Sequence, residues 1–484
     1  NLSQHVISPY SSLPIVDQTV LKHNEEVLMT KKYYYKGLRI HNKGKGMLGF
    51  EEFVENNLTE NKKTTSKFGF NTTYFNTYPT QQIVSTSSDS PISTTSFVND
   101  VIALGGKRIF PYVSFQTTTD NLTGLSETKT ISNFDAYGNP RSIQTNKGGL
   151  TETQTISYIQ KGSWCPNKPD SITTLTTYDG QSETRKIKYY YDDVTGNPTK
   201  EIINPNSPEY KVTTEYKNFN AFGQAQIIEV KAKDADGIER TRSSSMTYTS
   251  SGTSKGRFVT SKTNVLGETT TYDWNETRGL LNSETTRGKT TYYTYDGFGR
   301  LKETRYADGN RKTQVLQWAS PGNAIGAKYY SYAQASGNAP VTTWFDALSR
   351  ETQKDTYGLN DRKISVSTEY YTSGANKGKL YHVSEPYFEG ETKVWAETYS
   401  EYDDYGRPTT VQTLMGNVTT VYDGLSTTVT TPEETKTTTL NNSGFVASST
   451  VNGKTVSYTY YPSGLTKTAT PQGGQALSIE YNLQ

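Results

Sequence analysis

The sequence predicts an all-β protein built from many short antiparallel hairpins in series. Ten times along the 484 residues, an aromatic or apolar residue precedes Asp or Asn, two variable residues and then Gly or Ser, although the looser copies keep only part of this pattern. The segments between the copies are rich in Thr, Val, Ile and Tyr, which favour strands. No segment of a dozen or more residues carries an apolar stripe at helical spacing, so we expect almost no helix.

The clearest copies contain the residues of a capped turn. Asp or Asn at the first position and Gly at the fourth are favoured in type I turns, and the Asp side chain caps its own backbone. Looser copies begin at Tyr191, Leu440, Tyr461, Tyr272 and Tyr248. The five clearest copies are Tyr295-Asp296-Gly297-Phe298-Gly299-Arg300, Phe134-Asp135-Ala136-Tyr137-Gly138, Phe219-Asn220-Ala221-Phe222-Gly223-Gln224, Phe345-Asp346-Ala347-Leu348-Ser349-Arg350 and Tyr402-Asp403-Asp404-Tyr405-Gly406-Arg407.

A second kind of turn signal lies between these copies. Its members are dipeptides typical of tight β-hairpins, namely Gly148-Gly149, Asp236-Gly237, Asp308-Gly309, Gly416-Asn417 and Asn452-Gly453. Because the two turn signals are separated by strand-like segments, the sequence predicts antiparallel hairpins that follow one another along the chain.

Composition favours a thin wall over a compact globule. Apolar residues, with Gly counted and Tyr left out, make up about 32% of the chain, against roughly 45 to 50% in a typical domain. Aromatic residues still reach 12%, which argues against disorder. A wall one sheet thick, with water on both sides, needs few apolar residues and is stabilised by cross-strand Tyr and Thr pairs, each contributing about 0.2 to 1 kcal/mol.

Charge and segment character exclude several classes of protein. The formal net charge is +2, with acids and bases interspersed, so there is no electrostatic footprint for nucleic acid or an anionic membrane surface. No run is long and apolar enough to span a bilayer, and no signal peptide is visible. We expect the chain to be an internal piece of a larger protein. Its single Cys165 excludes an intramolecular disulfide.

We divide the chain into three regions. Residues 1–32 are irregular and are expected to be a connector from a missing upstream region. Residues 33–129 are expected to form a pre-repeat β region, in which Tyr33 to Phe50 predicts an aromatic strand, a turn and a Gly-spaced segment of close backbone approach. Residues 130–484 form the hairpin repeats, and loops or longer hairpins are expected at Ser163 to Pro169 and Trp318 to Pro340.

The repeated Tyr-Asp-x-x-Gly-Arg motif resembles that of the RHS or YD-repeat family, which includes the shell-forming B and C components of bacterial Tc toxins, polymorphic RHS toxins and the teneurins. The segment Gly44-Lys45-Gly46-Met47-Leu48-Gly49-Phe50 is similar to a Gly-rich signature found just ahead of the repeats in Tc toxin B-type proteins. The resemblance implies a strip of hairpins that spirals into a hollow cocoon or shell around a toxic or sequestered C-terminal polypeptide. The family's core segment and its autoproteolytic residues match no position here, so no cleavage residue is carried over.

We interpret the residues of the repeat turns as structural. Their Asp residues resemble catalytic or calcium-binding acids in type only, because each stands where a turn requires backbone capping. Their Arg residues are expected to pair with acids on the neighbouring coil or to face the cavity, and such surface pairs contribute at most about 1 kcal/mol each. These turn residues are Tyr295, Asp296, Gly299, Arg300, Phe134, Asp135, Gly138, Phe345, Asp346, Arg350, Tyr402, Asp403, Gly406 and Arg407.

No catalytic, cofactor or metal site is predicted. The lone Cys165 stands between Trp164 and Pro166, which indicates a packed loop rather than a nucleophile. The four His residues are too few and too scattered for ordinary metal-ligand spacing, and adjacent acids such as Glu51 and Glu52 point to opposite faces of a strand. Phosphate loops, nucleophile elbows and zinc motifs are absent from the sequence. The four histidines are His5, His23, His41 and His382.

We therefore expect a non-enzymatic shell segment of a bacterial secreted or cell-surface protein that encapsulates or carries an attached toxin or effector. Its expected partners are that C-terminal cargo or secretion and delivery machinery, and nucleic acid is not among them. The alternative is a cell-surface adhesin or a β-sheet module that binds glycan or protein, with Trp274, Trp318, Trp344 and Trp395 as platforms for sugars. A β-solenoid polysaccharide-degrading enzyme is disfavoured, because the repeats supply no clustered acids.

Overall fold

The structure is a computed structural model and describes residues 6–7, 14–23, 25–105, 108–161, 165–323 and 325–481. These residues are almost entirely β-strands and the turns that join them. The single helical element among them is the 3-10 turn η1 (Leu359–Asp361), as the absence of helical periodicity in the sequence predicts.

The strands are short and follow one another closely. The first fourteen are β1 (Val6–Ile7), β2 (Gln18–His23), β3 (Glu26–Lys36), β4 (Arg39–His41), β5 (Gly46–Gly49), β6 (Glu52–Asn57), β7 (Lys62–Asn71), β8 (Asn76–Ser85), β9 (Pro91–Ala103), β10 (Ile109–Asp120), β11 (Ser126–Phe134), β12 (Pro140–Lys147), β13 (Leu150–Lys161) and β14 (Cys165–Tyr178). The next thirteen are β15 (Gln181–Tyr191), β16 (Pro198–Ile203), β17 (Val212–Phe219), β18 (Ala225–Lys233), β19 (Glu239–Tyr248), β20 (Val259–Thr263), β21 (Thr269–Asn275), β22 (Leu280–Thr286), β23 (Lys289–Tyr295), β24 (Leu301–Arg305), β25 (Arg311–Trp318), β26 (Tyr329–Ala335) and β27 (Val341–Phe345). The last are β28 (Glu351–Tyr357), β29 (Lys363–Tyr370), β30 (Leu380–Ser384), β31 (Tyr387–Phe388), β32 (Trp395–Tyr402), β33 (Pro408–Thr413), β34 (Gly416–Asp423), β35 (Ser426–Thr430), β36 (Thr435–Leu440), β37 (Val446–Val451), β38 (Lys454–Tyr460), β39 (Thr466–Pro471) and β40 (Leu477–Ser478).

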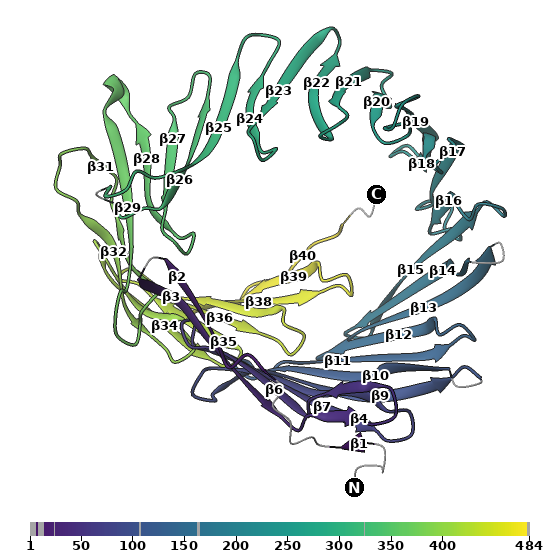
Figure 1. Ribbon diagram of the computed structural model, residues 1–484, viewed down its shortest axis with the longest axis horizontal. Helices are drawn as coiled ribbons and strands as arrows, with labels where there is room; N and C mark the ends of the chain where they lie inside the picture. Colours follow the sequence, from purple (N-terminus) through teal and green to yellow (C-terminus); the bar gives the residue numbers. More distant parts are fainter. Residues whose placement is uncertain are drawn as a thin grey trace.

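All strands except β1, β4 and β5 belong to one antiparallel sheet, in which nearly every strand pairs with its neighbours in sequence. The sheet is an open strip in the described part of the chain, since β2 pairs only with β3 and β40 only with β39. Figure 1 shows that the strip bends into a ring, so that its last strands return to the side of the first. The small sheet β1-β4-β5 holds the Gly-rich segment.

Successive turns alternate between the two long edges of the strip, because neighbouring strands run in opposite directions. Every copy of the repeat motif lies on the same edge, which we call the Asp edge; its turns include those that begin at Asp135, Asn220, Asp296, Asp346, Asp403 and Asn441. The opposite edge, which we call the Gly edge, carries two-residue turns such as Gly148-Gly149 and Asn452-Gly453. The Gly edge also carries capped turns at Asp234 and Asn264, so the two edges differ in the repeat motif and not in the use of capping.

For three of the predicted hairpin dipeptides the expected position was wrong. Asp236-Gly237, Asp308-Gly309 and Gly416-Asn417 are not the two central residues of a two-residue turn. The N–H groups of Gly237 and Gly309 donate to the carbonyls of Asp234 and Tyr306, so both glycines close four-residue turns. Gly416 pairs with Thr413 and lies in a strand, outside the two central turn residues. Each of these glycines has a positive φ, and a positive φ favours Gly in several turn types, which a dipeptide cannot distinguish.

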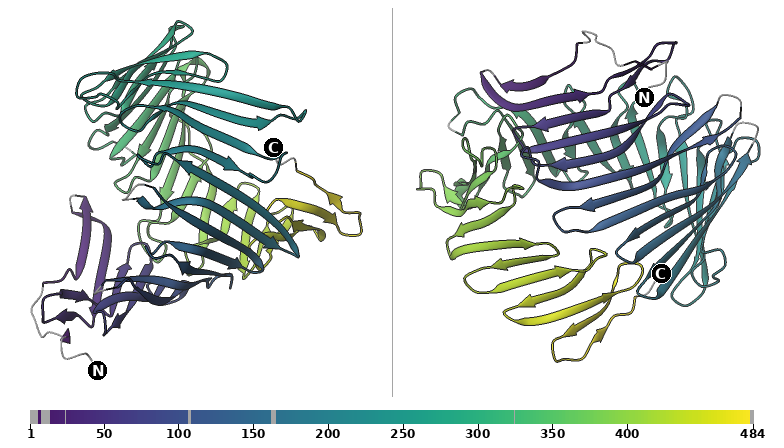
Figure 2. Two further views of the ribbon diagram at one scale, coloured as in Figure 1. Left: turned by 90° about the vertical axis from the view of Figure 1, so that its right-hand side faces the viewer. Right: turned by 90° about the horizontal axis from the view of Figure 1, so that it is seen from below.

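The two edges meet where the strip passes its own beginning. The Ser443 hydroxyl donates to the Gly148 carbonyl at 2.8 Å, and the Asn441 side chain donates to the Tyr178 hydroxyl at 2.9 Å. The Asn61 side chain likewise donates to the Asp404 carbonyl at 3.3 Å. In each contact the Asp edge of the later coil meets the Gly edge of the earlier coil, and Figure 2 shows the late strands alongside the early ones. The predicted fold class, a spiralling strip of antiparallel hairpins, is thus confirmed.

Replacing Gly148 with Ala should separate the coils at this contact, which we call the seam. The φ of Gly148 is +55°, which strains an Ala side chain, and in addition its Cβ would lie 2.0 Å from the Asn442 carbonyl oxygen. We expect faster hydrogen exchange at the backbone amides of the turn at Ser443, measured by mass spectrometry.

The control is Gly149→Ala, whose φ of +96° strains the same hairpin while the new Cβ meets nothing within 4 Å. This variant should lower the melting temperature without a matching increase in exchange at the turn of the later coil. Unchanged exchange there in Gly148→Ala would contradict the seam.

Candidate functional site

The repeat turn is the element that recurs along the Asp edge, and Asp296 shows how it is built. The Gly299 N–H donates to the Asp296 carbonyl at 3.1 Å, which closes a type I turn. One carboxylate oxygen of Asp296 accepts the N–H groups of Phe298 and Arg300, both at 2.9 Å. The backbone N–H of Arg300 and its side chain lower the pKa of the Asp296 carboxyl, because they stabilise its charged form.

The same capping geometry occurs at the other clear copies. Asp135, Asp346 and Asp403 each accept the N–H groups two and four residues ahead at 2.8 to 3.0 Å. Asn220 and Asn441 do so through their amide oxygens. The fourth residue has a positive φ, +84° at Gly299 and +64° at Ser349. Because a Ser side chain is sterically strained at such an angle, Gly is the better residue there.

The Arg that follows the turn pairs within its own turn. The Nε of Arg300, Arg350 and Arg407 donates to the second carboxylate oxygen of the Asp four residues earlier, at 2.6 to 2.8 Å. This differs from the expected pairing with acids on a neighbouring coil or exposure to the cavity. The Arg pairs locally because the Asp of its own turn is the nearest acid. Once one Asp oxygen caps the backbone, the other oxygen points at the residue after the Gly.

The guanidinium groups also connect one hairpin to the next. The Cζ atom of Arg350 lies 4.2 Å from the centre of the Tyr370 ring, and that of Arg407 lies 3.9 Å from the centre of the Tyr422 ring. Tyr370 lies on β29 and Tyr422 on β34, each near the end of the strand at the Asp edge. Cation–π contacts of this kind contribute about 0.5 to 1 kcal/mol at exposed sites.

The Tyr of each hairpin reaches back to the previous turn on the Asp edge. The hydroxyl of Tyr402 donates to the Leu380 carbonyl at 2.6 Å, that of Tyr295 to Leu281 at 2.9 Å, and that of Tyr460 to Val446 at 2.9 Å. In each case the acceptor is the second residue after the Gly of the preceding turn. Burial raises the pKa of Tyr402 to about 12, so the hydroxyl remains a donor across the physiological range.

Two copies with Phe at this position have ring contacts in place of the hydroxyl. Phe134 packs on Tyr112 with ring centres 4.3 Å apart, and Phe345 stacks on Tyr329 at 4.8 Å. The sequence pattern identifies the aromatic position only as a general strand former and does not show the role of the Tyr hydroxyl. The available signal was the preference for Tyr over Phe in many copies, since only Tyr can satisfy a backbone carbonyl.

Replacing Tyr402 with Phe should destabilise the protein by about 1 to 3 kcal/mol, the cost of leaving the Leu380 carbonyl without its donor. The measurement is the free energy of unfolding in urea. Tyr405→Phe is the matched control, because the exposed Tyr405 ring lies three residues away and its hydroxyl makes no hydrogen bond to the described residues. Equal losses in the two variants would refute the role given to the Tyr402 hydroxyl.

A ladder of alternating charges crosses three strands of the wall. Glu215 on β17 lies 3.0 Å from the Lys217 ammonium, 3.3 Å from Lys200 and 3.5 Å from Lys231, and Lys217 also pairs with Glu229. Hydrogen bonds from Lys217 and Lys200 lower the pKa of the Glu215 carboxyl to about 2. Cross-strand pairs of opposite charge fix which residues of neighbouring strands lie opposite one another.

An NMR titration of the side-chain carboxyls should show Glu215 with a midpoint near 2. A lowered carboxyl pKa adds stability that is present above the unfolded value of about 4.5 and is lost as the pH falls toward the folded value. Lys217→Ala should therefore raise the midpoint, whereas Lys454→Ala, at the far end of the strip, should not. A wild-type midpoint above 4 would contradict the ladder.

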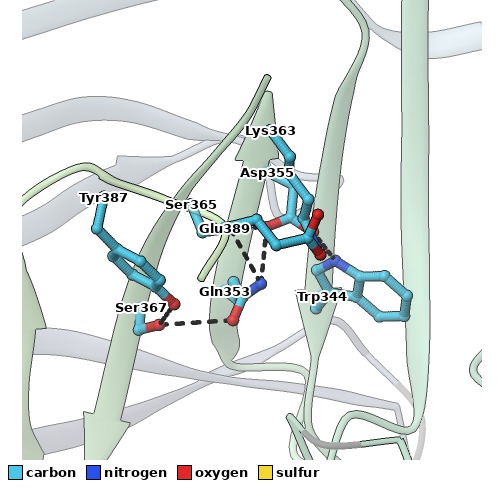
Figure 3. A network of polar contacts seen from close by, with 8 residues as sticks. All are labelled: Trp344, Gln353, Asp355, Lys363, Ser365, Ser367, Tyr387 and Glu389. Atoms are coloured by element: carbon cyan, nitrogen blue, oxygen red, sulfur yellow. Dashed lines mark hydrogen bonds and ion pairs between the residues drawn. The ribbon is translucent and has the colours of Figure 1, made fainter. Parts of the chain in front are cut away.

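A buried polar network lies where the strip changes partners (Figure 3). Asp355 is 3% exposed, and its carboxylate accepts hydrogen bonds from Trp344, Ser365 and Gln353, each at 2.7 Å. The Lys363 ammonium lies 3.3 Å from the same carboxylate. Both carboxylate oxygens are therefore occupied by donors, as a buried charge requires.

The network continues to β31, which pairs with β29. The Ser367 hydroxyl lies 2.8 Å from the Tyr387 hydroxyl, and the Ser384 hydroxyl accepts the Ser367 N–H at 2.8 Å. Here β29 pairs with β30 over one half of its length and with β31 over the other. Because its groups are already bonded to one another, we interpret this network as a structural anchor for β31. No motif in the sequence marks this network.

The other residues singled out in the sequence are dispersed. Trp274 donates to the Val259 carbonyl at 2.8 Å, and Trp395 stacks on His382 with ring centres 4.4 Å apart. His5 and the side chain of Cys165 lie outside the described residues. In the described part of the chain, no group of three or more His, Cys, Asp or Glu could hold a metal ion. No helix found there is long and apolar enough to cross a membrane.

Comparison with known proteins supports the fold. No protein-family model matches the chain, and no curated protein matches it. The crystal structure of TcdB2-TccC3 without its hypervariable C-terminal region matches with a TM-score of 0.61 and 10% identity, over 92% of this chain and 36% of that chain. TcdB2-TccC3-TEV and TcdB2-TccC3-Cdc42 both match with a TM-score of 0.63, at 9% and 10% identity and with the same coverage.

These matches define the class of fold: a curved strip of serial β-hairpins of the kind found in Tc toxin structures. The resemblance to the RHS-repeat region of the Tc toxins that the sequence predicts is confirmed at the level of the fold. The chain spans about a third of the length of those solved proteins.

Proposed function

We propose that this chain is a wall segment of a hollow RHS-type shell that encloses or carries an attached toxin or effector polypeptide. The observation that carries the proposal is the seam, where one coil of the hairpin strip packs edge to edge on another. A strip that winds upon itself in this way makes a continuous wall, whereas a flat sheet does not. The open centre of the ring in Figure 1 is where the enclosed polypeptide would lie.

The wall is stabilised without a thick apolar core. Among the described residues, the only hydrophobic ones classed as buried are Ile156 and Ala327. Stability comes instead from capped turns, Tyr hydroxyls and cross-strand hydroxyl pairs, such as Thr270 with Thr286 at 2.6 Å and Thr459 with Thr468 at 2.7 Å. A thin wall of this kind encloses a large volume with few residues, which suits a container.

The comparisons support the same role. One matching TcdB2-TccC3 structure lacks a hypervariable C-terminal region of that protein. By analogy, we propose that the cargo is a variable polypeptide attached at the C-terminal side of this shell, in a bacterial secreted or cell-surface protein. The chain itself would be structural and non-enzymatic, without cofactors, and the delivery machinery would be its other protein partner.

The division of the chain belongs to the same proposal. Residues 1–32 would connect to an upstream region, residues 33–129 would form the entry of the shell, and residues 130–484 would form its repeats. The hairpin strip runs without a break in strand pairing across both boundaries, from β2 through β3 and β6 and from β10 through β11 to β12. The regions would therefore differ in sequence motif and share one wall.

Encapsulation can be tested on the full-length parent protein by cryo-electron microscopy and limited proteolysis. We expect a closed shell with polypeptide density inside, and an attached polypeptide that resists protease until the shell is opened. Gly148→Ala, which separates the seam, should make that polypeptide cleavable, whereas Gly149→Ala should not. An open sheet docked on a partner, or a cargo equally cleavable in the wild-type protein, would overturn the proposal in favour of adhesion.

A further inference from the structure

A cavity of about 1210 Å³ lies between the first hairpin of the strip and the Asp-edge turns opposite it. On one side it is lined by Leu21, Lys22 and His23 of β2, and on the other by Phe298, Trp318 and Ala347. Its volume exceeds that of ordinary small-molecule sites, which run from about 300 to 1,000 Å³. The cavity is thus large enough for several side chains of a polypeptide.

Large apolar side chains stand exposed in this cavity. Trp318 is 83% exposed and Phe298 is 89% exposed, and Leu21 and Leu316 also remain open to solvent. Other tryptophans of the wall are packed: Trp274 stacks on Phe258 with ring centres 5.1 Å apart. Exposed aromatic groups that gather in one hollow mark an interaction surface, unlike single exposed residues.

The cavity is also positively charged. Lys22, Arg300 and Lys328 line it, and no Asp or Glu of the described residues does. Arg300 pairs with Asp296, but neither lysine forms an ion pair with a described residue. The chain as a whole is nearly neutral, with a net charge of +2, so this hollow concentrates uncompensated positive charge. A ligand that carries carboxylates is electrostatically complementary to it.

Two strands border the cavity with unpaired backbone. Strand β2 pairs only with β3 in the described part of the chain, and three consecutive residues of β2 line the hollow. Since consecutive residues point to opposite faces of a strand, the cavity runs along the edge of β2. Strand β25 pairs with β24 only from Arg311 to Thr313, although it pairs with β26 as far as Trp318. Such free edges bind extended peptides through backbone hydrogen bonds.

We propose that this cavity binds an extended segment of a partner polypeptide in which apolar and acidic side chains alternate. The segment adds to the free edge of β2, its apolar side chains pack on Trp318 and Phe298, and its carboxylates pair with Lys22 and Lys328. This role does not depend on encapsulation, because it requires only the first hairpin and the turns that face it.

The probe is a short acetylated, fluorescein-labelled peptide of alternating Leu and Glu, titrated with the full chain and followed by fluorescence anisotropy. We expect saturable binding that weakens as salt is added. Trp318→Ala, and separately the double change Lys22→Glu with Lys328→Glu, should each weaken binding by about tenfold or more. A peptide of alternating Leu and Lys should not bind.

The matched controls are Tyr137→Ala and Lys233→Glu, which change an exposed turn aromatic and a strand-end lysine far from the cavity. Both should bind the peptide as the wild-type protein does, and circular dichroism melts should show that every variant is folded. Absence of binding, equal binding of the Lys peptide, or full binding by Trp318→Ala would overturn the proposal.

Discussion

The strip depends on the hydrogen bonds that the side-chain carboxylate or amide of the first turn residue accepts within its own turn. At Asp296 one oxygen holds two backbone N–H groups and the other holds the Arg300 side chain, so three donors converge on a single residue. This cap fixes where a strand ends and where the next begins. In a wall hydrated on both faces, no apolar core would otherwise prevent a strand from slipping in register.

Several capped turns also contact neighbouring hairpins on the same edge. The Arg side chain that closes one turn lies over the Tyr ring of the next hairpin, as Arg407 does over Tyr422. The hydroxyl of a repeat Tyr in turn bonds the backbone just after the previous turn, as Tyr402 does at Leu380. The motif Tyr-Asp-x-x-Gly-Arg therefore encodes three contacts, one within a turn and two between turns, which explains why its residues recur together.

The sequence was sufficient to predict features that depend on neighbouring residues. It was insufficient to predict contacts between residues that lie far apart in the chain. Strands, capped turns and the absence of helix follow from neighbouring residues, and the fold class was predicted correctly. The seam joins Ser443 to Gly148 across 295 residues, and an irregular repeat length gives no means of counting which turns will meet. The network at Asp355 depends on the antiparallel pairing of β31 with β29, which is set by the path of the whole hairpin and not by any motif.

The third residue of the turn varies widely in size and burial. At the seam this position is Ser443, which is buried and whose hydroxyl donates to the Gly148 carbonyl. At the corresponding position Tyr137, Phe222 and Phe298 are all exposed. Because the cap uses only the backbone N–H of the third residue, its side chain is free to vary without loss of the turn. The chain can therefore keep one turn geometry throughout while this side chain varies from the small, buried Ser443 at the seam to exposed aromatic residues in other turns.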